Sequence, residues 1–300
     1  MRNRIIDIAE QPARLRIEHR QLVVDTGDKP ARIPLEDIAV IVSSHPQVSY
    51  TQAVLAELIA EGGAFVACDR NRLPVGMLLP LAGHFAQTER IRRQPELSLP
   101  RRKRLWQQLI RAKIGMQAAL LRDQCVDDAA LVALIKEVRS GDPSNIEAQA
   151  ARKYWTALFG SDFRRDRDAA DHNRFLNYGY AVLRAAVARS ICAAGLHPSI
   201  GLHHRNRYNP FCLADDLIEP YRVCVDKAVI GLTDKRDEIK EFDRETRTAL
   251  LASLMQAVVI GGEIRSLFDA LTRTAQSLAA VVIAERDSLE LPERLADAPT

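Results

Sequence analysis

The chain has 300 residues, 47% hydrophobic and 27% charged, so it can bury the core of one or two domains, and large-scale disorder is excluded. Its formal net charge of +3 is too small to indicate a nucleic-acid-binding protein by itself. The five cysteines form no CxxC pair, and neither a long apolar run nor a signal-peptide core is present. We therefore expect a cytoplasmic protein with no disulfide framework, no zinc ribbon and no membrane partner.

Residues 1–80 are predicted to form a small β-rich domain that contains one helix. Short apolar runs separated by turn residues indicate strands at 5–8, 13–18, 21–25 and 38–42. The segment 49–60 has a helical pattern that ends at two glycines, 62 and 63, and the apolar run 64–68 indicates a buried strand.

Residues 81–290 are predicted to form a larger all-α domain, because the periodicity becomes helical and the composition rich in Ala, Leu, Arg and Gln. Pro95 and Pro100 are expected to separate two helices in this part. The prolines of the last ten residues, 291–300, indicate a loose tail. The predicted fold class is therefore α+β.

The positive charge is concentrated in residues 90–104. This segment contains one acid, Glu96, and seven basic residues, which gives +6 and leaves −3 for the rest of the chain. The basic residues are Arg90, Arg92, Arg93, Arg101, Arg102, Lys103 and Arg104. Such a stretch is typical of a contact with a phosphate backbone, and equally of a solvated helix between domains.

Three separated segments, 144–155, 201–204 and 216–222, contain carboxylates and histidines that could bind a hard divalent ion. Glu147 follows Ser144 by three residues, which is the spacing of a helix capping box. It also lies in line with Ala151, Tyr154 and Leu158 on the face expected to turn inward, where a carboxylate needs a partner. Either helix capping or metal binding would account for Glu147.

The two later segments have the same two interpretations. His203 and His204 lie in a predicted turn, where a histidine is usually a polar surface residue. Asp216 and Glu219 share a helical face, and such acids could either favour the start of a helix or share a divalent cation that relieves their repulsion. Pro220 lacks an amide proton, so the helix should loosen there.

The residue patterns of these three segments, and their order along the chain, resemble those of one family, the CRISPR-associated integrases. These proteins, also called Cas-one endonucleases, insert new spacers into a CRISPR array. The resemblance is to a member from a type II system. It extends through residues 35–42, 73–80 and 176–183, spans both predicted domains, and fades after about residue 226.

The resemblance implies a magnesium or manganese site with Glu147, His204 and Glu219 as metal ligands and Asp216 as an accessory catalytic carboxylate. His204 matches the ligand position after Gly201, although the histidine doublet leaves His203 as an alternative. Arg152, Lys153, Arg205 and Arg207 lie beside these residues in the sequence and are expected to position a DNA end.

The resemblance also implies a function. The 3′-hydroxyl of a captured DNA fragment would attack a phosphodiester at the edge of a CRISPR repeat and so insert a new spacer, in antiviral defence. The protein would act as a homodimer joined through its β-rich domain, in a heterohexamer with a small ferredoxin-like companion protein.

Two alternatives stay open at this point. One is a non-catalytic DNA-binding scaffold, in which the acids only cap helices. The other is a metal-dependent repair nuclease that acts on branched DNA. A nucleotide hydrolase is disfavoured because the sequence has no glycine-rich phosphate loop with a lysine.

Overall fold

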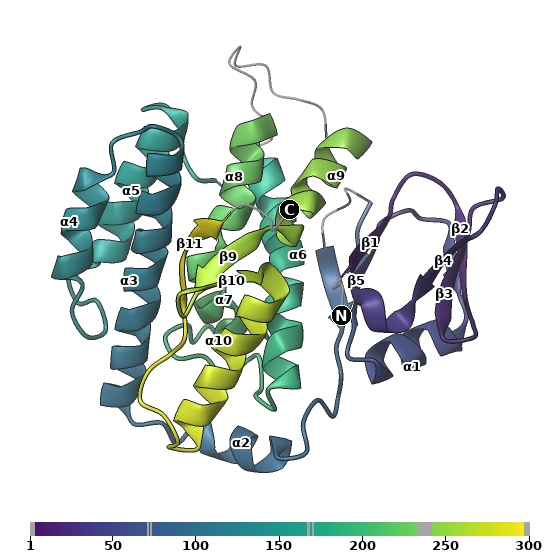
Figure 1. Cartoon of the computed structure of the whole chain (residues 1–300), viewed down its shortest axis with the longest axis horizontal. Helices are drawn as coiled ribbons and strands as arrows, with labels where there is room; N and C mark the ends of the chain where they lie inside the picture. Colours follow the sequence, from purple (N-terminus) through teal and green to yellow (C-terminus); the bar gives the residue numbers. More distant parts are fainter. Residues whose placement is uncertain are drawn as a thin grey trace.

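The computed structural model describes residues 4–70, 72, 74–166, 169, 171–232 and 242–296, and the expected α+β class is confirmed. Strands dominate the N-terminal part and helices the rest. In Figure 1 the two parts lie side by side, with the β-rich part on the right in purple and the helical part on the left.

The β-rich part contains two four-stranded sheets and one helix, α1 (Gln52–Ala60). The first sheet has the order β1 (Arg4–Ile8), β5 (Ile38–Ser43), β7 (Ala64–Cys68) and β8 (Pro74–Leu78). The second has the order β4 (Ala31–Pro34), β3 (Gln21–Asp25), β2 (Ala13–Glu18) and β6 (Val48–Tyr50). Between them lies a shared core with buried side chains from both sheets and from α1, namely Leu15, Leu22, Ile41, Val54, Leu58 and Phe65.

The five predicted strands and the predicted helix of this part are all present. Local sequence patterns are enough to predict these elements, because apolar runs and turn residues mark the bounds of each one within a few positions. The strands β4, β6 and β8 and the 3₁₀ turn η1 (Leu35–Asp37) were not predicted. β8 is an edge strand that pairs antiparallel with β7, whereas β1, β5 and β7 run parallel.

The helical part follows a connection that leads down to α2, at the bottom of Figure 1. Its longer helices are α3 (Leu99–Asp123), α5 (Ile146–Phe159), α6 (His172–Ala193) and α10 (Leu267–Val282). The shorter elements are α2 (Gln87–Arg93), α4 (Ala129–Glu137), α7 (Cys212–Leu217), η2 (Glu219–Tyr221), α8 (Val223–Leu232), α9 (Arg244–Ala252) and η3 (Ser253–Met255). Pro95 separates α2 from α3 as predicted, and Pro100 lies in the first turn of α3.

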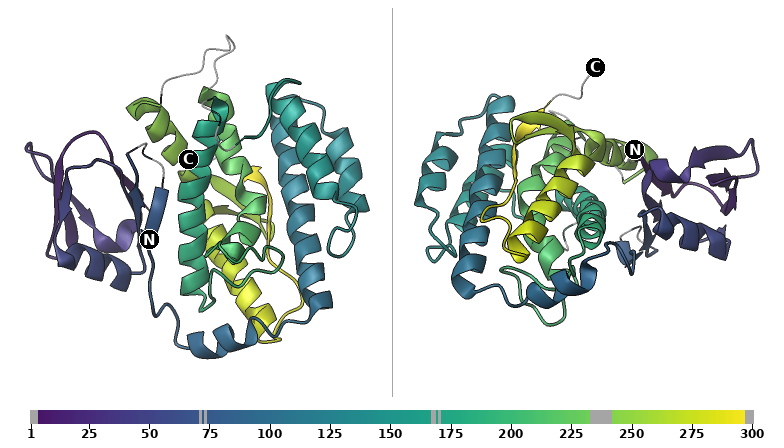
Figure 2. Two further views of the ribbon diagram at one scale, coloured as in Figure 1. Left: turned by 180° about the vertical axis from the view of Figure 1, so that it is seen from behind. Right: turned by 60° about the horizontal axis from the view of Figure 1, so that its bottom comes forward.

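The helix α6 is central to this part and packs against α7, α8 and α10. Its crossing with α8 depends on Gly179, because a Cβ there would lie 2.4 Å from Cγ1 of Val225. Figure 2 shows α3 standing next to α4 and α5 on the side away from the β-rich part. The candidate residues come from this helical part, Glu147 from α5, Asp216 from α7, Glu219 from η2 and His204 from the loop before α7.

The prediction of an all-α second domain is wrong in one respect. A three-stranded sheet, in the order β10 (Glu263–Ser266), β9 (Ala257–Ile260) and β11 (Pro292–Ala296), packs among the helices. Gly261 and Gly262 join β9 to β10 with φ values of 58° and 74°, a conformation that glycine adopts without strain. The short apolar run 257–260 cannot be told from a helical segment by its pattern.

The prediction of a loose tail is also wrong for residues 292–296. These residues form β11, which pairs antiparallel with β9 and packs against α3, and Leu295 and Ala296 are buried. Residues 297–300 of the expected tail lie outside the described part. Within the described residues, no helix is both long and apolar enough to span a membrane.

Candidate active site

Glu147 lies at the start of α5, but the predicted capping box with Ser144 does not form. The residue before the helix, Asn145, has a left-handed backbone with φ of 51°. Asp142 takes the capping role instead, because its two carboxylate oxygens accept from the amides of Ile146 and Glu147, both at 2.9 Å. The side chain of Glu147 is thus available for another partner.

That partner is Lys113, a buried lysine of α3. Its ammonium Nζ lies 2.6 Å from Oε1 of Glu147 and 2.7 Å from Oε2 of Glu219. Two carboxylates from distant segments therefore converge on one cation. Burial lowers the pKa of Lys113, but Glu219 and Glu147 outweigh burial and raise it.

Glu219 is buried in η2, and both of its carboxylate oxygens contact cationic side chains. Oε2 faces Lys113, while Oε1 accepts from Nε of Arg222 at 3.1 Å and lies 3.0 Å from its Nη2. Burial raises the pKa of Glu219, but Arg222 and Lys113 overcome it and hold the value at about 2. The carboxylate is therefore charged at neutral pH.

The helical run that contains Asp216 and Glu219 is interrupted as the proline predicted. α7 ends at Leu217, and residues 219–221 continue as the 3₁₀ turn η2, with Pro220 in its first positions. The two carboxylates have separate protein partners, because Asp216 contacts His204 and Glu219 contacts Lys113.

Asp216 is fully buried and organises the loop that carries the two histidines. Its Oδ2 accepts from the amides of Leu202 and His203, at 2.6 and 3.1 Å, and its Oδ1 accepts from the amide of His204 at 3.1 Å. Oδ1 also lies 2.7 Å from Nδ1 of His204. Because a carboxylate only accepts, Nδ1 carries the proton and Nε2 has the free lone pair.

The two histidines are held differently. The hydrogen bond to Asp216 raises the pKa of His204 above its usual value, although burial acts in the opposite direction. The ring of His203 stacks on Trp106 with centroids 4.1 Å apart and an interplanar angle of 4°. Burial lowers the pKa of His203. A ring fixed by a carboxylate at Nδ1 is the usual arrangement for a metal-binding histidine, which favours His204 over His203.

The expected ligands Glu147, His204 and Glu219 do not form a ready-made cluster. Within the described part of the chain, no three His, Cys, Asp or Glu side chains are close enough to hold a metal ion together. The residues nevertheless suit magnesium or manganese, because two carboxylates already meet around one cation and the histidine can offer Nε2.

A cavity of about 640 Å³ adjoins His204. Its lining includes three arginines, Arg165, Arg184 and Arg222, with Tyr208 and Phe211. Asp215 holds Arg184 through two contacts of 2.8 and 2.9 Å. The guanidinium of Arg165 donates to Asn173 and Asn177, at 2.7 and 2.6 Å. This cavity has the charge to accept phosphate groups next to the carboxylates.

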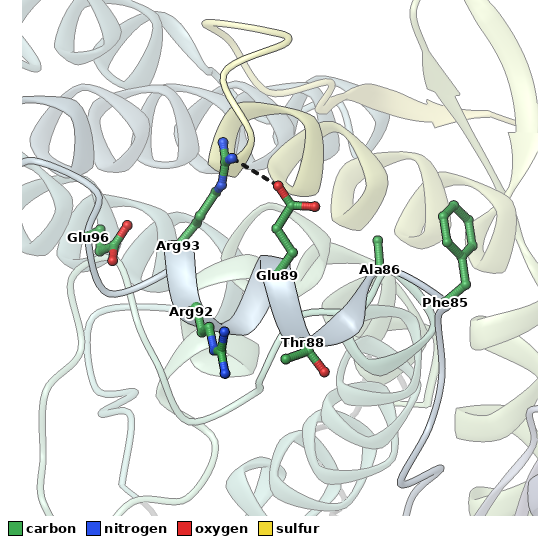
Figure 3. Close-up of a pocket in the computed structure, with 7 residues that line it drawn as sticks. All are labelled: Phe85, Ala86, Thr88, Glu89, Arg92, Arg93 and Glu96. Atoms are coloured by element: carbon green, nitrogen blue, oxygen red, sulfur yellow. Dashed lines mark ion pairs between the residues drawn. The ribbon is translucent and has the colours of Figure 1, made fainter.

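Two arginines of the predicted basic segment have partners within the protein. Arg90 donates to the carbonyl of Ala194 at 2.8 Å, which ties α2 to the end of α6. Arg93 pairs with Glu89 at 2.9 Å, while Arg92 points away from this pair (Figure 3). Part of the segment's charge is therefore used to hold helices together.

The remaining predicted DNA contacts differ in their surroundings. Arg102 is half-buried, whereas Lys103 is exposed with its stem beside Gly141. Arg152 and Lys153 are exposed on α5, and Arg205 and Arg207 are exposed just after His204. The guanidinium of Arg207 lies 4.6 Å from the ring centroid of Tyr208, beside the cavity. Arg205 and Arg207 thus lie nearest to the candidate site along the chain.

Sequence reasoning missed several site residues, above all Lys113, Arg165, Arg184 and Arg222. A signal existed for Lys113, because it is a lone lysine on the apolar stripe of α3 between Ile110 and Ile114. Arg222 follows Glu219 by three residues, a spacing at which helical ion pairs form. Arg165 and Arg184 gave no local signal, because their partners Asn173, Asn177 and Asp215 lie 8 to 31 positions away in the sequence.

The chain is similar to known proteins in sequence and in fold. A model of the family described as CRISPR associated protein Cas1 matches residues 6–260. The chain is 38% identical over 292 residues to the CRISPR-associated endonuclease Cas1 of Neisseria meningitidis serogroup C (strain 8013), covering 96% of this chain and 95% of that protein.

Two solved structures share the fold at low sequence identity. A casposase bound to integration product has a TM-score of 0.77 at 21% identity, covering 95% of this chain and 92% of that chain. A chain of a Cas6-RT-Cas1–Cas2 complex has a TM-score of 0.72 at 18% identity, covering 95% of this chain and 35% of that chain.

Proposed function

The chain belongs to the CRISPR associated protein Cas1 family, and on that basis we propose that it is a metal-dependent DNA endonuclease and integrase of CRISPR adaptation. The 3′-hydroxyl of a captured DNA fragment attacks a phosphodiester of the CRISPR repeat. The bond to the old strand breaks as the new one forms, so one strand is joined and another 3′-hydroxyl is released. The observation that carries the proposal is the convergence of Glu147 and Glu219 on one cation, at a cavity that Arg165 and Arg222 also line.

Glu147, Glu219 and His204 would hold a magnesium or manganese ion. When bound, this ion would polarise the phosphoryl oxygens and stabilise the charge on the attacking and leaving oxygens. Asp216 keeps the proton of His204 on Nδ1 and so leaves Nε2 available. Arg222 holds the Glu219 carboxylate in place through Oε1.

The DNA would be positioned by the positive residues around this site. Arg165 and Arg184 line the cavity and are held rigidly by Asn173, Asn177 and Asp215. Fixed guanidinium groups bind phosphate more strongly than mobile ones. Arg205 and Arg207 extend this positive surface beyond His204, and Arg92, Lys103, Arg152 and Lys153 are further candidates for backbone contacts.

The assembly is also part of the proposal. The β-rich part, residues 1–80, would join two copies in a homodimer. DNA and a small ferredoxin-like companion protein would complete a heterohexamer in the cytoplasm, and the shared fold with a chain of a Cas6-RT-Cas1–Cas2 complex supports such a companion. Mass measurement of the protein with and without the companion tests this arrangement, and a monomer under both conditions would contradict it.

The non-catalytic scaffold explains the site less well. It requires the acids to act as helix caps, but Asp142 caps α5, Glu147 pairs with Lys113, and Asp216 binds the loop before α7. A repair nuclease would use the same site as an integrase, so only the reaction products distinguish these two functions. Joined strands of increased length support integration, whereas shortened strands alone support the nuclease.

The decisive experiment is strand transfer of a labelled duplex with free 3′-hydroxyl ends into a plasmid that carries a CRISPR repeat. The reaction contains manganese and the companion protein. We expect Glu147→Ala to abolish joining while DNA binding is kept, and Glu137→Ala, an exposed glutamate of α4, to behave as wild type. Joining that survives Glu147→Ala would disprove the proposed site.

A further inference from the structure

Lys113 occupies the space between the two carboxylates that the proposed function assigns to a metal ion. Its ammonium is 2.6 Å from Glu147 and 2.7 Å from Glu219, and its side chain is only 10% exposed. A buried lysine is costly unless its charge is compensated, and here both compensating groups are the candidate ligands. The ammonium therefore takes the place between the two candidate ligands that the proposed ion would need.

An ammonium and a divalent ion cannot use these two oxygens together. Magnesium and manganese lie about 2.1 Å from oxygen ligands, so an ion held by the same oxygens would fall almost on the position of Nζ. Two cations at such a distance repel strongly in a buried environment. One of them must leave before the other can bind.

The charges lead to the same conclusion. Glu147 and Glu219 supply two negative charges, and Lys113 and Arg222 supply two positive ones, so the group is neutral as it stands. A divalent ion gains little from a neutral group of side chains. Once the ammonium withdraws, the group has a net charge of −1 and attracts the ion.

The structure offers a place for the displaced ammonium. A second cavity, of about 250 Å³, is lined by Lys113 itself, by the acids Glu219 and Asp226, and by Arg165 and Arg222. Because the four-carbon stem of lysine is flexible, the ammonium can turn away from the two oxygens toward this cavity, where the two acids offset the two guanidinium groups.

We propose that Lys113 is a positioning residue that competes with the divalent ion. Its ammonium holds Glu147 and Glu219 together in the ion-free protein, and it leaves them when the ion binds. This inference rests on the metal site of the proposed function. Its consequence is that Lys113 weakens ion binding to the DNA-free protein and keeps the carboxylates ordered until the ion arrives.

The test is the affinity of the DNA-free protein for Mn²⁺, measured by calorimetry and by the Mn²⁺ electron paramagnetic resonance signal. We expect Lys113→Met to bind Mn²⁺ at least about tenfold more tightly than wild type, because one competing positive charge is removed. Lys113→Arg keeps the charge and should bind as weakly as wild type. Lys136→Met, an exposed lysine of α4, is the matched control and should change nothing.

A stability measurement accompanies the titration, in case Lys113→Met folds poorly. In EDTA this variant should melt at a lower temperature than wild type, because Glu147 and Glu219 repel each other without the ammonium. Mn²⁺ should restore the melting temperature of the variant and change that of wild type less. A loss of stability that Mn²⁺ does not restore would count against the competition.

The outcomes separate this inference from the proposed function. Mn²⁺ binding that Glu147→Ala abolishes but Lys113→Met leaves unchanged or weakens would overturn the role of Lys113 alone. Equally tight binding by Lys113→Met and Lys113→Arg would overturn it too, since charge would then not matter. Absence of Mn²⁺ binding by wild type and by every variant would refute the metal site and the inference together.

Discussion

His204 and Asp216 are joined by a contact of 2.7 Å between Nδ1 and Oδ1, and the same carboxylate accepts the amides of three consecutive loop residues. Ring and loop are therefore fixed by one buried side chain. A histidine held in this way has a single tautomer and a single orientation, which is what binding through Nε2 requires. Asp216 thus acts on the proposed chemistry through His204.

Asp216→Asn is expected to reduce strand joining by about 10- to 100-fold, as is usual when the partner of a metal-binding histidine is lost. It should also reduce the free energy of unfolding by about 1–3 kcal/mol, because the NH₂ group of asparagine faces an amide that needs an acceptor. Strand-transfer rates and urea unfolding measure the two effects. Asp287→Asn removes a surface ion pair and is the control. Unchanged joining would show that His204 is oriented by other means.

Gly201→Ala is expected to disrupt the histidine loop. A Cβ at this position would lie 2.4 Å from the carbonyl oxygen of His204 and 2.9 Å from Oδ2 of Asp216, so the loop could not close over the carboxylate. Strand joining and the melting temperature should both fall. Gly115→Ala in α3 is the matched control, because nothing lies within 4 Å of its Cβ. The control should stabilise the protein by about 0.5–1 kcal/mol, the usual gain in a helix.

Asp226→Asn is expected to change the pH dependence of stability. Burial raises the pKa of Asp226 to about 6, although the hydroxyl groups of Tyr180 and Tyr154 bond to it and lower it. Because the folded protein holds this proton more tightly than the unfolded chain, the stabilisation is complete below 3.8, the usual pKa of an aspartate, and is lost as the pH rises through about 6. The asparagine side chain of the variant is uncharged at every pH, so the variant does not lose this stabilisation.

Relative to wild type, Asp226→Asn should therefore gain stability between pH 4 and pH 8, by an amount on the order of 3 kcal/mol. Urea unfolding of both proteins at several pH values gives the difference directly. Parallel pH profiles for the two proteins would show that Asp226 titrates alike in the folded and unfolded chains.

Arg247→Met is expected to weaken the contact between α9 and the β-rich part. Arg247 is fully buried and pairs with Asp7, at 3.6 Å, and with Glu10. The cost should be about 1–3 kcal/mol, because Asp7 loses its partner while partly buried, whereas Glu10 is 40% exposed and can be hydrated. Calorimetric melting measures the loss. The exposed Arg244 of the same helix provides the control, and Asp7→Asn combined with Arg247→Met should recover part of the stability.

The sequence by itself determined the elements whose signals are local. Five strands of the β-rich part (β1, β2, β3, β5 and β7), the helix α1 and the interruption at Pro220 follow from apolar patterns, turn residues and a missing amide proton. The resemblance to a family added what spacing alone could not give, because it singled out Glu147, His204 and Glu219 as one site.

Only the tertiary structure decided the partners of these residues. Lys113 lies 34 positions before Glu147, and nothing in the intervening sequence shows that α3 brings its ammonium between Glu147 and Glu219. The same holds for β11, which becomes a strand only because β9 offers an edge with which it can pair. Side-chain partners across long separations depend on how the helices and strands pack, and packing is a property of the whole chain.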